Sequence, residues 1–174
     1  MLRTPFGEAF QIAFLPKDFD AALERWLALG AGPFFKTENR RFPLSIFRGR
    51  EVGTTIDFAL GYWGDVQIEM IRQLDSEPSV YSEWMEAGRE GVHHLGVVVP
   101  DLGAARARCE SVGYEVLQEI QGDGMEIFYA AAGVADLPMI ECMTPPPATL
   151  QMFEVMKAAH RGWDGSDPVR PFAR

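Results

Sequence analysis

Residues 11–30 read QIAFLPKDFDAALERWLALG, and residues 94–113 read HLGVVVPDLGAARARCESVG. At an offset of 83 the two stretches align without a gap, and an aspartate, an Ala-Ala pair and a closing glycine each fall over their equivalents. Internal similarity at a fixed offset indicates a fold built from repeated units. We therefore interpret the chain as two copies of one supersecondary unit.

Each copy opens with a short apolar strand that leads into a helix. The strands are expected at residues 10–15 and 95–99. Asp18 and Asp101 are suited to cap the helices, because a carboxylate accepts hydrogen bonds from the free amides of a first turn. Gly30 and Gly113 stand where a helix commonly ends in a left-handed residue. Each copy therefore begins as strand, turn and helix.

Strand-like segments follow each helix. They are expected at 33–41, 54–61 and 66–72 in the first copy, and at 114–120, 125–131 and 138–143 in the second. The last strands match again at an offset of 72, with Ile68-Glu69-Met70 over Ile140-Glu141-Cys142. The second copy is thus eleven residues shorter, and we assign the difference to a loop at 42–52 that is rich in arginine and proline.

This pattern predicts an α+β fold in which two tandem β-α-β-β-β modules form a curved mixed sheet around a cleft. The modules are assigned to residues 8–75 and 92–145, a linker with its own helix to 76–91, and a C-terminal helix and tail to 146–174. The tail beyond that helix is expected to be disordered or loosely docked. Trp163 and Phe172 favour some docking.

Composition argues against several classes of protein. The 174 residues include 16 Lys or Arg and 25 Asp or Glu, which gives a net charge of −9. An acidic surface opposes binding to phosphates, so we expect neither nucleic acid nor a membrane as a partner. Apolar runs are too short for a membrane helix, and residues 1–7 show no secretory signal, so we expect a cytoplasmic protein. Two cysteines make no disulfide scaffold, and Cys109 is expected in the core.

Four polar residues interrupt apolar strand sequence, and the repeat pairs Gln11 with His94 and Glu69 with Glu141. A carboxylate among apolar neighbours is costly unless it is paired or binds a metal. Taken singly, each residue has an ordinary structural explanation, such as an edge-strand glutamine or a hydrogen-bonded interior histidine. Together they predict a site for a divalent metal: zinc, nickel, cobalt, manganese or iron. Such an ion would polarise a carbonyl and stabilise an enolate.

Other candidates have plainer explanations. His93 is expected on the opposite face of its strand from His94, and His160 on the surface. Four arginines flank the 42–52 loop and are expected to be solvated, the alternative being recognition of a substrate phosphate or carboxylate: Arg40, Arg41, Arg48 and Arg50. Seven aromatic residues are candidates for the cleft wall, although core packing would explain most of them: Phe34, Phe35, Phe47, Phe58, Tyr62, Trp63 and Tyr129.

The chain resembles the vicinal oxygen chelate superfamily, which includes glyoxalase I, methylmalonyl-CoA epimerase, bleomycin-resistance proteins and extradiol dioxygenases. The resemblance covers roughly residues 8–145. It rests on the two modules, on Glu69-Met70-Ile71-Arg72-Gln73-Leu74 and on Gly91-Val92-His93-His94-Leu95-Gly96-Val97. The second motif looks like the entry to the second module in the epimerase and glyoxalase I-like branches. A glutamine at position 11 is similar to one branch of glyoxalase I, whereas the epimerase pattern usually has histidine there.

The resemblance implies that Gln11, Glu69, His94 and Glu141 bind the metal. It implies a metal-dependent lyase, isomerase or epimerase that removes a proton next to a carbonyl of a small-molecule substrate. Glu69 and Glu141 are then ligands and candidate general bases, and we favour Glu141 because its neighbours are apolar. The alternatives are a metal-free binding protein of the bleomycin-resistance type and an iron(II) dioxygenase, which normally needs two histidines and one carboxylate. The superfamily often dimerises, so a homodimer is expected.

Overall fold

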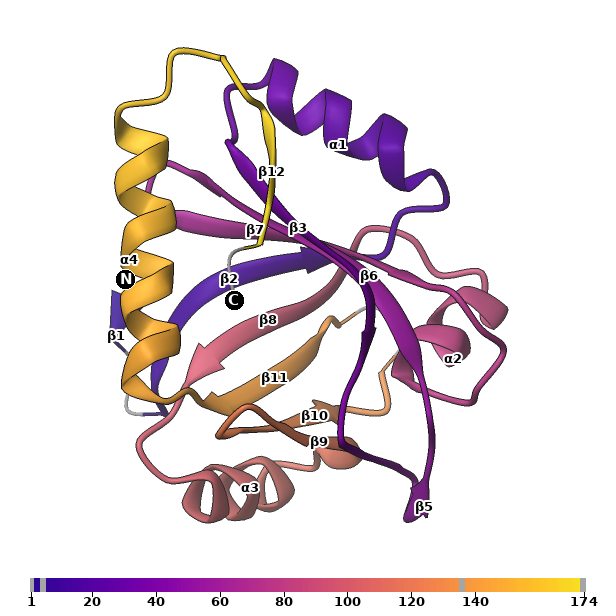
Figure 1. Ribbon diagram of the computed structural model, residues 1–174. Coiled ribbons are helices and arrows are strands. Elements are labelled where there is room, and N and C mark those ends of the chain that lie inside the picture. Colours follow the sequence, from indigo (N-terminus) through magenta and orange to yellow (C-terminus); the bar gives the residue numbers. More distant parts are fainter. Residues whose placement is uncertain (1, 4–5, 135–136, 173–174) are drawn as a thin grey trace.

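The computed structural model describes residues 2–3, 6–134 and 137–172 (Figure 1). The first module contains β2 (Glu8–Phe14), α1 (Phe19–Ala28), β3 (Phe34–Arg41), β6 (Thr55–Trp63) and β7 (Val66–Gln73). The linker holds α2 (Val80–Glu86). The second module contains β8 (Val92–Val98), α3 (Leu102–Ser111), β9 (Glu115–Gly122), β10 (Met125–Ala131) and β11 (Met139–Thr144). The remaining elements are β1 (Leu2–Arg3), β4 (Leu44–Phe47), β5 (Arg50–Glu51), α4 (Pro147–Arg161) and β12 (Val169–Pro171).

The strands form one curved, unclosed mixed sheet in the order β12-β3-β6-β7-β2-β8-β11-β10-β9-β4-β5, with β1 paired to β2. The modules meet at its centre, where β2 runs antiparallel to β8. Within the modules β2 pairs in parallel with β7, and β8 pairs in parallel with β11. The predicted fold class is therefore confirmed. Among the helices that the structure describes, each is too short or too polar to cross a membrane.

The expected caps set the equivalent starts of α1 and α3. The Asp18 carboxylate accepts a hydrogen bond from the Ala21 amide at 3.0 Å, and the Asp101 carboxylate accepts one from the Ala104 amide at 2.7 Å. Gly30 and Gly113 follow the helices with φ of 84° and 86°, a backbone conformation that glycine adopts without a steric penalty. The sequence repeat is thus repeated in the local structure.

Two helices cover the outer face of the sheet, and two lie toward its inner face. Helix α1 packs Phe19 and Leu23 against the apolar side of β6 and β7, while α3 packs Ala105 and the buried Cys109 against β10 and β11. Figure 1 shows α1 and α3 on outer sides of the sheet. Helices α2 and α4 contribute to a separate apolar cluster that includes Trp84. The inner face of the sheet lies between α2 and α4.

Residues 42–52 are not the loop that composition suggested. Strand β4 pairs with β5 and also with β9 of the second module. Alternate side chains of β4, Ser45 and Phe47, are buried. This alternation is short and lies among arginines, so it was not predicted as a strand. The segment therefore extends the sheet beyond the second module.

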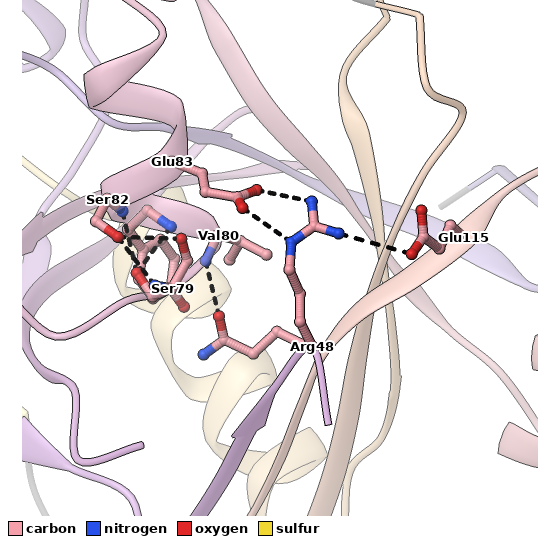
Figure 2. Close-up of polar contacts among 8 residues, drawn as sticks. Arg48, Ser79, Val80, Ser82, Glu83 and Glu115 are labelled. Atoms are coloured by element: carbon pink, nitrogen blue, oxygen red, sulfur yellow. Dashed lines mark hydrogen bonds and ion pairs between the residues drawn. The ribbon is translucent and has the colours of Figure 1, made fainter. Parts of the chain in front are cut away.

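Arg48 is exposed, as expected, but two carboxylates hold its guanidinium. Its Nε and Nη2 atoms donate to the Glu83 carboxylate at 2.8 and 3.0 Å, and its Nη1 atom lies 3.6 Å from Glu115 (Figure 2). In the same view Ser79 caps α2, accepting hydrogen bonds at its hydroxyl from the Tyr81 and Ser82 amides. The β4–β5 turn is thereby fixed to both α2 and β9.

The C-terminal segment is ordered through residue 172. Strand β12 pairs in parallel with β3, so the expectation of a disordered tail is wrong and the docking of Phe172 is confirmed. Helix α4 begins at Pro147, a residue suited to a first helical turn. His160, expected on the surface, is partly exposed there and has a partner at each ring nitrogen. The Gly64 amide donates to its Nε2 atom at 3.0 Å, and its Nδ1 atom lies 2.6 Å from the Gly32 carbonyl.

Candidate metal centre

The four predicted site residues come from the four central strands of the sheet. In the register of these strands, Gln11 and Glu141 both lie opposite Gly96, while Glu69 and His94 both lie opposite Ala13. Ala13 and Gly96 are themselves equivalent in the repeat. The small residues leave room above the sheet, into which the longer polar side chains extend.

Three of the four residues converge closely. The Nε2 atom of His94 lies 3.2 Å from Oε2 of Glu69 and 3.3 Å from Oε2 of Glu141. One ligand atom from each residue falls within 4.8 Å of the others. His94 is fully buried, so its Nε2 atom faces these carboxylates away from solvent. This nitrogen points between two carboxylates.

Gln11 is held so that its carbonyl oxygen is free. Its Nε2 atom donates to Oε1 of Gln67 at 2.8 Å, and the Gln67 amide donates in turn to the Tyr62 hydroxyl at 3.2 Å. The Oε1 atom of Gln11 is buried and has no hydrogen-bond partner among the described residues. It packs on Gly96, where an added Cβ would stand 2.4 Å away. Gln67 was not predicted as part of the site. Its position two residues before Glu69, on the same face of the strand, is the sequence signal that could have indicated it.

These donors suit a divalent ion of intermediate hardness. The set offers two carboxylates, an amide oxygen and an imidazole nitrogen, a mixture that zinc, nickel, cobalt, manganese and iron accept. Gln11 Oε1 is buried with no hydrogen-bond partner among the described residues, which is costly unless something binds it, and His94 Nε2 lies between two carboxylates whose charges a cation would balance. The residues therefore fit a metal ion.

The ring of His93 contacts the ring of His94, whereas strand alternation predicted that the two side chains lie on opposite faces. A bulge places Ala13 opposite His94 but Phe14 opposite Val92, and this irregularity turns His93 toward its neighbour. The two Nδ1 atoms lie 2.9 Å apart, and His93 Nε2 lies 3.3 Å from the Val80 carbonyl. If His93 donates to Val80, its Nδ1 accepts from His94, which leaves the His94 Nε2 lone pair for a metal.

Electrostatics favour a positive charge at this point. Burial alone would lower the pKa of His94, but the negative charges of Glu141 and Glu69 outweigh it and raise that pKa to about 9. Burial also raises the pKa of Glu69, an effect that His94 opposes and Glu141 strengthens. Burial lowers the pKa of His93 well below its ordinary value, so this ring is neutral. A cation between the two carboxylates relieves their repulsion.

Tyr129 distinguishes the two carboxylates. Its hydroxyl donates to Oε1 of Glu141 at 2.5 Å and lies 3.0 Å from the Tyr81 hydroxyl. Burial and the charge of Glu141 raise the pKa of Tyr129, so the hydroxyl keeps its proton. Tyr129 lies opposite Glu141 in the sheet, whereas Leu60 lies opposite Glu69. The sequence indicated Tyr129 only as a cleft-wall aromatic.

A cavity of about 610 Å³ opens beside the site and is lined by Gln11, Glu69 and Glu141. Of the seven aromatic candidates, Phe58 and Tyr129 line it. Four others are buried or partly buried elsewhere, and Trp63 is 51% exposed. Of the four arginines, Arg40 lines the cavity. A ligand entering this cavity would meet Gln11, Glu69 and Glu141, with His94 buried beneath them.

Comparison with known proteins identifies the family. The model of the Glyoxalase/Bleomycin resistance protein/Dioxygenase superfamily matches residues 10–129. The chain belongs to this superfamily, as its motifs predicted. No protein with a curated description matches it significantly.

Solved structures show the same fold at low identity. Methylmalonyl-CoA epimerase from Mycobacterium tuberculosis is 22% identical, with a TM-score of 0.58 over 87% of this chain and 97% of that one. A hypothetical protein from Bacillus halodurans C-125 is 14% identical, with a TM-score of 0.56 over 80% and 95%. A variant of Streptomyces coelicolor methylmalonyl-CoA epimerase, in complex with 2-nitronate-propionyl-CoA, is 18% identical, with a TM-score of 0.53 over 81% and 96%. The epimerase branch suggested by the motifs is thus represented among these structures.

Proposed function

We propose that this protein is a metal-dependent lyase, isomerase or epimerase that removes a proton next to a carbonyl group of a small molecule. The observation that carries the proposal is the convergence of Glu69, His94 and Glu141, together with Gln11, which lines the same cavity as the two carboxylates and has a buried Oε1 atom without a partner among the described residues. Membership of the superfamily and the epimerases among the structural neighbours support this class of reaction. A divalent ion bound there would act as a Lewis acid on the substrate oxygen.

The geometry favours Glu69 over Glu141 as the base. One oxygen of Glu141 accepts the Tyr129 hydroxyl, and its side chain is 5% exposed. Glu69 receives no hydroxyl donor from the described residues, and its side chain is 13% exposed. A carboxylate that borders the cavity without such a hydrogen bond is freer to take a proton from a substrate carbon. Glu141, held by the hydrogen bond from Tyr129, would then act as a metal ligand and not as the base.

Metal content of the purified protein tests the proposal. Protein prepared without a chelator or a histidine tag should contain about one equivalent of transition metal, and Glu141→Gln should lose it. Glu126→Gln, on an exposed position of β10, is the matched control and should keep the metal. Circular dichroism would check that both variants are folded.

Either outcome directs the next assay. Bound metal calls for a screen of enolisable carbonyl compounds by exchange of the proton next to the carbonyl with solvent deuterium. If the protein contains no metal and takes up none from zinc, nickel, cobalt, manganese or ferrous salts, the proposal is wrong. The cavity would then favour metal-free binding of a small molecule, as in the bleomycin-resistance type.

A further inference from the structure

The cavity beside the four-residue site has a mainly apolar wall. Six of the apolar side chains that line it come from four different elements or their flanks: Ile56, Phe58, Met125, Ile127, Met152 and Phe172. A cavity of about 610 Å³ is in the range that accommodates a drug-sized molecule. The apolar wall is therefore large enough to contact much more than a reacting carbonyl.

Part of this wall comes from outside the family's matched region. The family model ends at residue 129, whereas Met152 belongs to α4 and Phe172 follows β12. Phe172 is fixed by its amide, which donates to the Lys36 carbonyl at 3.0 Å. Its ring packs edge-on against Phe58, with ring centroids 5.8 Å apart. The C-terminal segment thus adds an aromatic wall to the cavity.

Charge along the rest of the cavity is neutralised. Arg40 is the one basic residue among the described lining residues, and its Nη2 atom lies 2.6 Å from the Asp123 carboxylate, which also lines the cavity. The Arg40 guanidinium also lies over the Phe42 ring, 5.0 Å from its centroid. A phosphate or carboxylate on a substrate would compete with Asp123 for Arg40 and would also face the carboxylates of Glu69 and Glu141. The lining therefore disfavours an anionic group along this wall.

One polar atom breaks the apolar wall. The Thr37 hydroxyl is buried, lines the cavity and has no hydrogen-bond partner among the described residues. A buried hydroxyl without a partner is unfavourable, and a ligand oxygen would satisfy it. Thr37 therefore offers one hydrogen bond to a molecule that is otherwise in apolar contact.

We infer that the substrate of this site joins its carbonyl end to an uncharged, largely apolar body that lies against the C-terminal segment and accepts one hydrogen bond from Thr37. The inference of a carbonyl end depends on the proposed function, whereas the inference of an apolar body depends only on the residues that line the cavity. The inference selects hydrophobic ring systems or medium-length chains over substrates whose body carries phosphate or carboxylate within the cavity.

Binding of two probe series by isothermal titration calorimetry tests the inference. The first series is acetohydroxamate, hexanohydroxamate and octanohydroxamate, with suberic monohydroxamate as the probe that ends in a carboxylate. The second is the matching amides, hexanamide and octanamide, which chelate metal poorly. We expect affinity to rise about fourfold per added methylene, the value for full burial, and the carboxylate-ended probe to bind at least tenfold more weakly than octanohydroxamate.

Point variants in the full chain locate the effect. Phe172→Ala should flatten the gain with chain length, because it removes the ring and keeps the backbone hydrogen bond. Met152→Lys should shift the preference toward suberic monohydroxamate. Val155→Ala, also in α4 but 59% exposed, is the matched control and should bind like the wild type. Thermal melts would show that each variant is folded.

The outcomes separate this inference from the proposed function. A chain-length gain that depends on Phe172 but not on added zinc supports the apolar subsite while arguing against the metal site. A dependence on zinc with no chain-length gain overturns the apolar subsite and leaves the metal site standing. Equal affinity for neutral and carboxylate-ended probes, a gain unchanged in Phe172→Ala, or no binding in either series overturns the inference.

Discussion

Substitution of Gly96 by alanine should displace Gln11 from the site while leaving the sheet intact. Gly96 lies opposite Gln11 in the antiparallel pair of β2 and β8. Its backbone is not among the left-handed glycines, so alanine adds no backbone strain. The added Cβ would stand 2.4 Å from Oε1 and 2.8 Å from Cβ of Gln11. Both distances are inside van der Waals contact. Rotation of the Gln11 side chain relieves the contact at Oε1, but Cβ is fixed to the backbone, so β2 and β8 also have to shift locally.

Metal affinity and stability should both fall. Overpacking of a core position typically costs about 1–3 kcal/mol, and the contact with Gln11 Cβ requires a backbone shift, so we expect about 2–3 kcal/mol of lost stability. Misplacement of a group at a metal site commonly reduces affinity about 10–100-fold, which corresponds to about 1.4–2.8 kcal/mol of binding free energy. The two losses are of similar size, so the metal affinity has to be compared under conditions where the variant is shown to be folded.

Competition with a chromophoric chelator for zinc measures the affinity, and urea unfolding of the metal-free protein measures the stability. Gly103→Ala, in α3, is the matched control, since its added Cβ would meet only Asp101 Oδ1 at 3.3 Å. Gln11→Ala should weaken binding to a similar degree, and the double variant with Gly96→Ala should be little worse than either single variant. Wild-type affinity in a folded Gly96→Ala protein would refute a ligand role for Gln11. An equal loss in Gly103→Ala would show that the effect is not specific to the site.

Three further predictions concern the scaffold. Burial alone would raise the pKa of Asp57, but the hydrogen bond from Arg72 and a backbone amide lower it overall. Asp57→Asn should therefore lower the free energy of unfolding by about 1.5–3 kcal/mol above pH 4. The difference between variant and wild type should close as pH falls through the lowered pKa of Asp57. A constant difference from pH 7 to 3 in urea unfolding would contradict this. Gly61→Ala should destabilise by about 1–3 kcal/mol in the same assay, because its Cβ would stand 2.8 Å from the fully buried Phe34 ring; a loss under about 0.5 kcal/mol would argue against rigid packing there. Arg48→Ala should cost less than about 1 kcal/mol, and high salt should reduce that cost, since its ion pairs are 45% exposed on the arginine side; a salt-independent loss would indicate packing instead.

The internal repeat allowed the sequence to predict the centre of the fold. Equivalent strands in two copies tend to meet about a pseudo-twofold axis, and this pairing brings Gln11, His94, Glu69 and Glu141 to one face. Local signals sufficed for the helices, because Asp18 and Asp101 bond to amides only three residues away. The prediction of the central strands thus depends on the repeat, and the prediction of the helix starts depends on contacts that are short in sequence.

Features that depend on contacts between distant segments were not predictable in this way. Strand β4 forms because β9, about 70 residues later, offers it an edge. Strand β12 forms on β3 across more than 130 residues, and no local pattern distinguishes it from a free tail. The turn of His93 toward His94 follows from a bulge whose position depends on pairing with β2. In each case tertiary pairing decides what the local sequence leaves open.

The two halves of the site are equivalent in backbone and different in chemistry. Each carboxylate occupies the same register position in its module, but Tyr129 faces Glu141 where Leu60 faces Glu69. Likewise Gln67 lies opposite Gln11, while Met139 lies opposite His94. The repeat thus supplies symmetric positions for a metal, and the neighbours of each position set its hydrogen bonding. Both carboxylates border the same cavity, but of the two only Glu141 accepts a tyrosine hydroxyl from the described residues, and this difference is why we propose Glu69 as the base.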